Sequence, residues 1–168
     1  MTKKVYLQPY HCLGCEECVE ACAKEHGFQS NSFVEWINNF YPMSVRCMHC
    51  EDAPCVKVCP TSAITITRLY GVQVDVQSCI GCGSCKIACP FGIPQINPVT
   101  RKMSKCDLCA ERQKQGRQPA CVENCPYSAL ILVDPEEMAA AKRAQNAKKA
   151  LNAGMNLVSA ANVDEEGC

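Results

Sequence analysis

Sixteen of the seventeen cysteines in this 168-residue chain fall into four groups of four, and this spacing constrains the chain more than any other feature. Two groups follow the pattern C-x2-C-x2-C-x3-C, a third widens the middle gap to four residues, and the fourth widens it to eleven. A disulfide framework has no reason to repeat so short a spacing, so the pattern predicts metal centres held by thiolates. In chain order the groups are Cys12, Cys15, Cys18 and Cys22; Cys47, Cys50, Cys55 and Cys59; Cys79, Cys82, Cys85 and Cys89; and Cys106, Cys109, Cys121 and Cys125.

The shortest spacing, when a proline follows it, is the ligand pattern of bacterial ferredoxins. Proline follows the last cysteine in three of the four groups, whereas Ala23 follows the first group. Four thiolates suit a [4Fe–4S] cluster, and a tetrahedral sulfur site also suits zinc. Only the fourth group, with its long gap, resembles a zinc site built from two separated pairs. No group lacks a cysteine, so we expect four [4Fe–4S] clusters with iron bound through all sixteen cysteines.

Composition excludes several other classes. Lys plus Arg and Asp plus Glu each number 17, so the apoprotein is formally neutral. Four oxidised clusters of about −2 each would make the loaded protein about −8, so we expect no binding to nucleic acid. No apolar stretch has the length of a membrane span, and the N-terminus resembles neither a signal peptide nor a twin-arginine signal. We therefore expect a cytoplasmic protein, with export on a partner's signal as the open alternative.

Short strands are predicted between the cysteine groups. After the last cysteine of the second, third and fourth groups, a proline ends a helical turn and an apolar strand follows. Segments 64–67 and 72–76 alternate like paired strands, with a turn at 69–71. Residues 4–7 are expected to form the opening strand.

Four cysteine groups make two ferredoxin-like units, because the fourth cysteine of each group ligates the other cluster of a unit. The predicted hairpin joins the second and third groups and favours one unit at about 44–98. The first and fourth groups then form an outer unit from 1–43 and 99–134. Chain order alone equally allows pairing the first group with the second and the third with the fourth. We expect an α+β fold of two bis-[4Fe–4S] units, one inserted in the other, and a C-terminal α-helix.

Each unit has too little apolar material for an independent core, so we expect folding to depend on cluster insertion. The nearby histidines are interpreted mainly as ordinary loop residues and the nearby lysines as solvated, although a cation there would raise a cluster potential. These residues are His11, His26, His49, Lys24, Lys86 and Lys105. The apolar residues expected to surround the clusters are Ile64, Ile66, Val74, Ile80, Ile87, Ile96, Leu130 and Leu132.

Residues 29–43 hold the single tryptophan, Trp36, with Phe33, Phe40 and Tyr41. Two interpretations are open for this aromatic segment. It is either a hydrophobic brace between the two units or a surface that faces a partner protein, since aromatic side chains often anchor interfaces.

A helix is predicted over residues 135–160. Asp134 suits the N-cap, Pro135 the first helical position, and Glu136 and Glu137 complement the helix dipole. The helix either docks on the rest of the chain or forms an arm for a partner or for self-assembly. The remainder of segment 135–168 is expected to be a disordered tail that ends in a free exposed thiol, Cys168.

No nucleophile–base pair, phosphate loop or dinucleotide fingerprint occurs in the chain, and every expected cluster is fully ligated by cysteine. No iron would be open to a substrate. We therefore expect no catalytic residue and a protein that transfers electrons without being an enzyme.

Residues 1–133 resemble the four-cluster, ferredoxin-type electron-transfer subunits of molybdopterin oxidoreductases and related hydrogenase complexes. The most specific matching segments are CMHCEDAPC at 47–55, CPTSAI at 59–64, KCDLC at 105–109 and PACVENCP at 119–126. The absence of a proline after Cys22 is a mild departure from the family pattern.

The resemblance implies four ligand sets, named here A to D, in which groups exchange their fourth cysteines. Set A is Cys12, Cys15, Cys18 and Cys125; set B is Cys22, Cys106, Cys109 and Cys121; set C is Cys47, Cys50, Cys55 and Cys89; set D is Cys59, Cys79, Cys82 and Cys85.

Within the family the chain is similar to the small subunits of formate dehydrogenases, formate hydrogenlyases and hydrogen-dependent carbon dioxide reductases of anaerobic metabolism. The resemblance implies a relay between a catalytic subunit, either a molybdenum or tungsten formate dehydrogenase or a hydrogenase, and a second electron carrier. Self-assembly through the C-terminal helix is an open further expectation. The alternatives are a free polyferredoxin, an electron-transfer subunit of another molybdopterin reductase, and a filament-forming assembly subunit.

Overall fold

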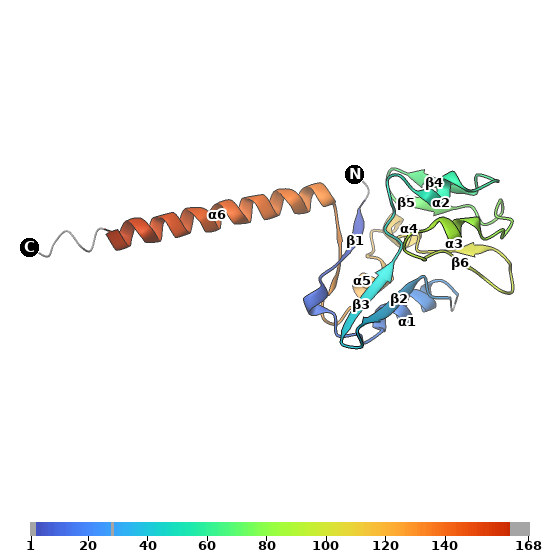
Figure 1. Ribbon diagram of the computed structural model, residues 1–168, viewed down its shortest axis with the longest axis horizontal. Coiled ribbons are helices and arrows are strands. Elements are labelled where there is room, and N and C mark those ends of the chain that lie inside the picture. The colour runs from blue at the N-terminus through green and yellow to red at the C-terminus, as the bar shows by residue number, and fades with distance from the viewer. Residues whose placement is uncertain (1–2, 28, 162–168) are drawn as a thin grey trace, which may run out of the picture. The chain divides into compact units, whose positions relative to one another are not determined.

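The computed structural model describes residues 3–27 and 29–161, with side chains described up to Ala153. It divides into a cysteine-bearing unit, residues 1–133, and a second unit that begins at Asp134. The fold is α+β: within the described residues, the strands pair into four two-stranded antiparallel sheets joined by short helices (Figure 1). No helix in the described part of the chain is long and apolar enough to cross a membrane.

One of these sheets was predicted from the sequence, and the two strands of another were predicted without their pairing. Strand β4 (Ile64–Thr67) pairs with β5 (Gly71–Val74), and Ile64 lies opposite Val74. The predicted turn lies between them, although β5 is shorter than the expected strand at 72–76. The opening strand β1 (Lys4–Leu7) is also confirmed, and it pairs with β8 (Leu130–Val133). This pairing brings the two ends of the cysteine-bearing unit together.

The other two sheets contain elements that were expected only in part. Strand β2 (Ser32–Ile37) forms a hairpin with β3 (Tyr41–Arg46), so the aromatic segment is a β-hairpin. Strand β6 (Gln95–Ile96) pairs with β7 (Met103–Ser104). Pro94 precedes β6, and because proline has no backbone N–H, it limits this strand to two residues.

One rule relates the cysteine groups to the helices: the third cysteine of each group is the second residue of a short helix, and all four of these cysteines are buried. Proline after the last cysteine prevents three of these helices from continuing. The first group has Ala23 there, and its helix runs on through Cys22. The helices are α1 (Glu17–Glu25), α2 (Pro54–Lys57), α3 (Ser84–Ala88), α4 (Ala110–Lys114) and α5 (Ala120–Glu123), with a 3-10 turn, η1 (Pro9–His11).

The elements of the cysteine-bearing unit contact one another in two groups. Helices α2 and α3 pack together with the β4–β5 hairpin beside them, and α1 packs on α5 and β2 (Figure 1). The unit has two small hydrophobic cores, and both include cysteine side chains. One core contains Ile64, Val72 and Met103, and the other contains Leu130. The nested arrangement of two units stays a prediction.

Three of the eight apolar residues expected to surround the clusters are exposed instead. Ile64 and Leu130 are buried, but Ile87 is 88% exposed, Ile80 64% and Ile66 50%. Ile87 lies two residues after the buried Cys85 in α3, and two residues rotate a helix by about 200°, so its side chain points outward. Ile80 is exposed although it lines the hollow that contains Cys79, Cys82 and Cys85, and Ile66 lies opposite Val72 near the turn of the β4–β5 hairpin. Val74, Ile96 and Leu132 are half-buried.

The predicted C-terminal helix is confirmed as α6 (Pro135–Ala161). The backbone N–H of Glu136 donates to Oδ1 of Asp134 at 2.9 Å, which is the N-cap bond that the sequence predicts. The expected tail with Cys168 lies outside the described residues. Whether α6 docks on the chain or forms an arm stays open.

Candidate iron–sulfur sites

Three hollows in the cysteine-bearing unit are each lined by four cysteines, three from one group and the last cysteine of another group. Their empty volumes are similar, about 320, 360 and 330 Å³. The cysteines in these hollows are Cys12, Cys15, Cys18 and Cys125; Cys47, Cys50, Cys55 and Cys89; and Cys59, Cys79, Cys82 and Cys85. These are the cysteines of sets A, C and D.

The four cysteines of set B are all buried. Cys109 interacts electrostatically with Cys121 and Cys22, and Cys121 interacts with Cys106 and Cys22. Burial raises the pKa of Cys106, Cys109 and Cys121 to about 12 each. A buried thiolate is therefore unfavourable by itself, and a bound cation would supply the missing positive charge. This chemistry fits an iron cluster.

Cysteines of successive sets interact in one order. Cys18 of set A raises the pKa of Cys121 in set B, and Cys47 of set C raises the pKa of Cys106 in set B. Cys55 of set C likewise raises the pKa of Cys85 in set D. Each effect requires proximity in a medium of low dielectric constant, so Cys18 lies near Cys121, Cys47 near Cys106 and Cys55 near Cys85. In the expected ligand sets, these three contacts join A to B, B to C and C to D.

The two ends of this series are open to solvent. Cys15 of set A and Cys82 of set D are exposed, whereas the cysteines of sets B and C are buried or half-buried. Electron exchange with another protein requires a cluster near the surface, so sets A and D have the geometry of terminal sites and set B that of an interior site.

Backbone amides donate hydrogen bonds to cysteine sulfur atoms in three of the sets. The amides of Ala129, Met103 and Asn31 lie 3.3 Å from the sulfurs of Cys125, Cys79 and Cys22, respectively. Bonds of this type stabilise thiolates and help to set cluster potentials.

Two glycines are required in the cysteine loops. Gly14 has a φ of +72°, and a Cβ there would lie 2.7 Å from the Trp36 ring. Gly81 has a φ of +69°, and a Cβ there would lie 1.9 Å from the carbonyl oxygen of Arg101. Both loops therefore need a residue without a side chain.

His49 is not an ordinary loop histidine. It is only 2% exposed, and its Nδ1 accepts a hydrogen bond from the backbone N–H of Val72 at 3.1 Å. Burial and the nearby Lys105 and Lys4 lower its pKa to about 3, so the ring is neutral. Gly71 makes room for this ring, because a Cβ there would lie 2.7 Å from it. The sequence offered no signal for this arrangement.

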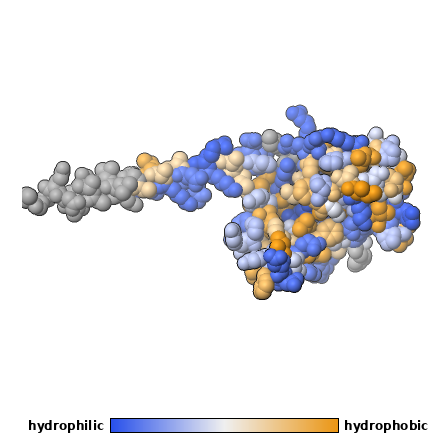
Figure 2. Space-filling model, viewed as in Figure 1, coloured by the Kyte–Doolittle hydropathy of each residue, from blue (hydrophilic) through white to orange (hydrophobic). Residues whose placement is uncertain are grey.

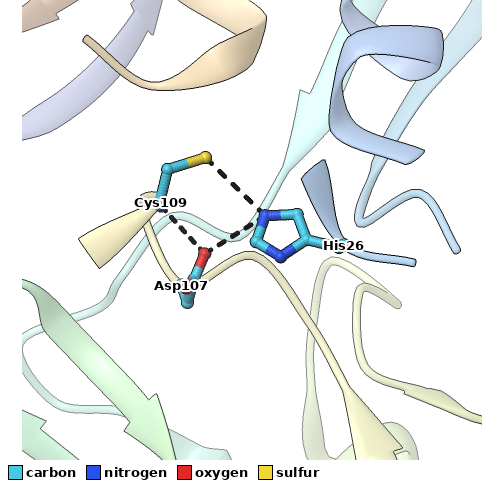
Figure 3. Close-up of side chains that lie close together, drawn as sticks. All are labelled: His26, Asp107 and Cys109. Carbon is cyan, nitrogen blue, oxygen red and sulfur yellow. Dashed lines mark hydrogen bonds and ion pairs between the residues drawn. The ribbon is translucent and has the colours of Figure 1, made fainter. Parts of the chain in front are cut away.

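A second histidine lies against set B. Nε2 of His26 is 3.6 Å from the sulfur of Cys109 and 3.5 Å from Oδ1 of Asp107 (Figure 3). The same carboxylate oxygen accepts the backbone N–H of Cys109 at 2.8 Å. Asp107 therefore orients both the histidine ring and the cysteine loop. Of the three histidines, only His11 is exposed as expected.

The expectation that the nearby lysines are solvated is correct for two of three. Lys24 and Lys86 are exposed, and Lys24 forms an ion pair with Glu20 at 2.7 Å. Lys105 is only 5% exposed and lines the hollow of set C, so the expectation is wrong for this residue. Lys105 is buried because β5 and the fourth cysteine group lie together in space, and this proximity cannot be predicted from the residues next to Lys105 in the sequence.

Family comparison agrees with this geometry. The 4Fe-4S dicluster domain family matches residues 38–135, and a second 4Fe-4S dicluster domain family matches residues 11–64. The chain therefore belongs to the 4Fe–4S dicluster proteins, and its sixteen clustered cysteines hold four [4Fe–4S] clusters.

Relatives define the type more closely. The chain is 38% identical to the probable anaerobic dimethyl sulfoxide reductase chain YnfG of Escherichia coli over 79% of this chain and 74% of the relative. It is 40% identical to the thiosulfate reductase electron transfer subunit PhsB of Salmonella typhi over 71% of this chain and 69% of the relative. It is thus a ferredoxin-type electron-transfer subunit of the molybdopterin oxidoreductase family.

One relative is much longer. The chain is 40% identical to the putative oxidoreductase AegA of Escherichia coli over 79% of its own length but spans only 22% of that protein. Iron–sulfur modules of this type therefore make up most of some relatives and only a small part of others.

Proposed function

We propose that this chain relays electrons through ligand sets A to D between the catalytic subunit of a molybdopterin reductase and a second redox partner. The observation that carries the proposal is the order in which cysteines of successive sets interact, with exposed cysteines at both ends. A [4Fe–4S] cluster accepts and releases one electron without bond chemistry. The chain's residues hold the clusters, exclude water from the interior sets and present two ends to partners.

The ligand assignment in this proposal is that of sets A to D, in which groups exchange their fourth cysteines. It is supported by the cysteines that line each hollow and by the mutual interactions of the set B cysteines. Replacing Cys125 or Cys89 would test it, because each loss should alter the spectrum of a cluster whose other ligands come from a different group.

The relatives favour a particular class of catalytic partner. Two of the three relatives compared above are named for dimethyl sulfoxide and thiosulfate reductases, the third is named only as a putative oxidoreductase, and none of the three names mentions formate or hydrogen. We therefore propose a reductase of small oxidised sulfur compounds as the leading partner. The formate dehydrogenase or hydrogenase expected from the sequence is the second candidate.

The aromatic hairpin supports a partner at the set A end. Trp36 packs over Gly14 in the loop that holds Cys12 and Cys15, and about half of its surface remains exposed. At the tip of the hairpin, Phe40 is 79% exposed and Tyr41 is 70% exposed. Exposed aromatic side chains of this kind are typical anchors of protein interfaces. We propose that this hairpin contacts a partner protein.

Apolar side chains are also exposed outside this hairpin. Figure 2 shows hydrophobic side chains distributed over the visible face of the cysteine-bearing unit, among hydrophilic ones. Val99, Ile87 and Leu69 are each at least 70% exposed. Exposed apolar residues scattered in this way are normal on proteins that work alone, so a co-purifying partner is what distinguishes a subunit from a freely diffusing polyferredoxin.

Anaerobic purification from the native cells tests the proposal. We expect about sixteen irons per chain, together with a large co-purifying subunit that contains molybdenum or tungsten. An isolated chain with the same iron would favour the polyferredoxin, and substantial zinc would overturn the ligand assignment. Cell fractionation in the same experiment tests the predicted cytoplasmic location. Truncation after Asp134 tests self-assembly, since an unchanged particle size would exclude a filament built by α6.

A further inference from the structure

Among the described residues, three positively charged side chains are buried in the cysteine-bearing unit, and one of them, Arg112, forms ion pairs with Glu25 and Glu123. The other two are Arg46, which is 4% exposed, and Lys105, which is 5% exposed. Each directly precedes the first cysteine of a group, Cys47 and Cys106. In the part of the chain that the structure describes, neither forms an ion pair with a carboxylate. A buried charge without a partner is costly, so a negative group must compensate each cation.

Arg46 lies between sets A and B. Its Nη2 donates to Oγ of Ser44, which lies 3.2 Å from the sulfur of Cys18 and lines the hollow of set A. Its positive charge also lowers the pKa of Cys121 in set B. Its Nε is buried and has no hydrogen-bond partner among the described residues. The guanidinium is thus held beside thiolates and not beside a carboxylate.

Lys105 lies between sets B and C. It lines the hollow of set C, and its Nζ donates to the backbone carbonyls of Val72 and Cys106, the latter at 2.9 Å. Its charge lowers the pKa of Cys47 in set C and of Cys106 in set B. Neutral carbonyl groups orient the ammonium but do not neutralise it.

We propose that Arg46 and Lys105 compensate the negative charge of the clusters on either side of them and thereby raise the reduction potentials of those clusters. Reduction adds one negative charge to a cluster that already carries about −2 with its four thiolates. A fixed cation therefore stabilises the reduced form more than the oxidised form. The inference rests on the ligand assignment in the proposed function.

The proposal predicts which clusters respond to each substitution. Loss of the Arg46 charge affects clusters A and B, and loss of the Lys105 charge affects clusters B and C. Cluster B is the one that responds to both. Cluster D has neither cation beside it and serves as an internal reference in the Arg46 and Lys105 variants.

The test is a redox titration of the anaerobically purified, iron-loaded protein, followed by electron paramagnetic resonance. In Arg46→Gln and Lys105→Gln, we expect the ratio of reduced to oxidised cluster at a fixed potential to fall at least tenfold. For a one-electron couple, a tenfold fall corresponds to a reduction potential that is lower by about 59 mV. Arg46→Lys and Lys105→Arg should restore most of the shift. Lys86→Gln is the matched control, because Lys86 follows the ligand Cys85 but is exposed and screened by solvent.

Three outcomes decide the matter. Potentials that stay unchanged in fully loaded glutamine variants, or that fall equally in Lys86→Gln, would overturn the proposal. Loss of iron from the glutamine variants but not from the charge-conserving variants would support charge compensation. Loss of iron from all four variants would show that the shape of the Arg46 and Lys105 side chains matters and their charge does not, and this result would also overturn the proposal. Replacement of Cys125 or Cys89 separately tests the ligand assignment.

Discussion

The imidazole of His26 reaches across from the end of α1 to the cysteine loop of the fourth group, with its Nε2 3.6 Å from the sulfur of Cys109 (Figure 3). The same nitrogen lies 3.5 Å from Oδ1 of Asp107. Once Cys109 ligates a cluster, its thiolate and the Asp107 carboxylate can only accept hydrogen bonds, so the tautomer with a hydrogen on Nε2 is the one that fits both contacts. The histidine is thus a donor to a sulfur of set B.

Replacing His26 should lower the potential of cluster B. His26→Ala removes the donor to Cys109, and donors to sulfur stabilise the more negative, reduced state. A redox titration measures the shift, and His11→Ala is the control because His11 lies beside Cys12 but is exposed. An unchanged cluster B potential would show that the bond has no electronic effect.

The conformation of the set D loop should depend on Gly81 more than on Gly83. Both have positive φ, but only Gly81→Ala would place a Cβ against backbone, at 1.9 Å from the carbonyl oxygen of Arg101, whereas Gly83 has open space there. We expect Gly81→Ala to cost about 1–3 kcal/mol more than Gly83→Ala, because an overpacked loop must shift. Thermal unfolding and iron content measure this. Equal effects of the two substitutions would contradict the steric argument.

His49 should make stability depend on pH. Its pKa is about 3 in the folded protein against an ordinary value of 6.5. Between these values the unfolded state binds more protons, so stability is fully present above pH 6.5 and falls as the pH is lowered toward 3. Chemical unfolding between about pH 7 and 5 should show a decline, because the reference pKa of histidine lies in this range.

The same decline should be weaker in His49→Leu. At neutral pH this variant should be less stable by about 1–3 kcal/mol, because the buried N–H of Val72 loses its acceptor. A pH dependence identical to that of the unaltered protein would assign the decline to other groups.

Removal of iron should unfold the cysteine-bearing unit. Its two hydrophobic cores are small and contain cysteine side chains. Burial also raises the pKa of Cys106, Cys109 and Cys121 to about 12. Without iron the unit loses both its crosslinks and the partners of its buried thiols. Circular dichroism after anaerobic chelation should show loss of the cooperative transition, and reconstitution with iron and sulfide should restore it. A cooperative transition that survives chelation would contradict the prediction.

The aromatic hairpin tip should contribute to partner binding without affecting the clusters. Phe40→Ser should weaken binding to the co-purified partner about tenfold, equivalent to about 1.4 kcal/mol, if the side chain is an interface anchor. Leu69→Ser is the matched control, since Leu69 is 70% exposed at the turn of another hairpin. Binding assays with iron-loaded protein make the comparison, and equal retention of the partner by both variants would place the interface elsewhere.

Much of the local structure follows directly from neighbouring residues. The cysteine spacing predicts the number and kind of clusters, and proline after Cys59 predicts where α2 must end. Asp134 and Pro135 predict the start of α6, and alternation predicts the β4–β5 hairpin. These features depend on interactions within a few residues, which covalent spacing and backbone geometry determine.

The remaining features depend on which segments meet in space. Lys105 is buried because β5 and the cysteine hollow of set C enclose it, and Ile87 is exposed because its helix turns Cys85 inward. Nothing in the residues next to His49 or Arg46 predicts their burial. The sequence by itself therefore determined the number and kind of the clusters. Only the tertiary structure decided which charges surround them, because electrostatic environment depends on distance in space and not along the chain.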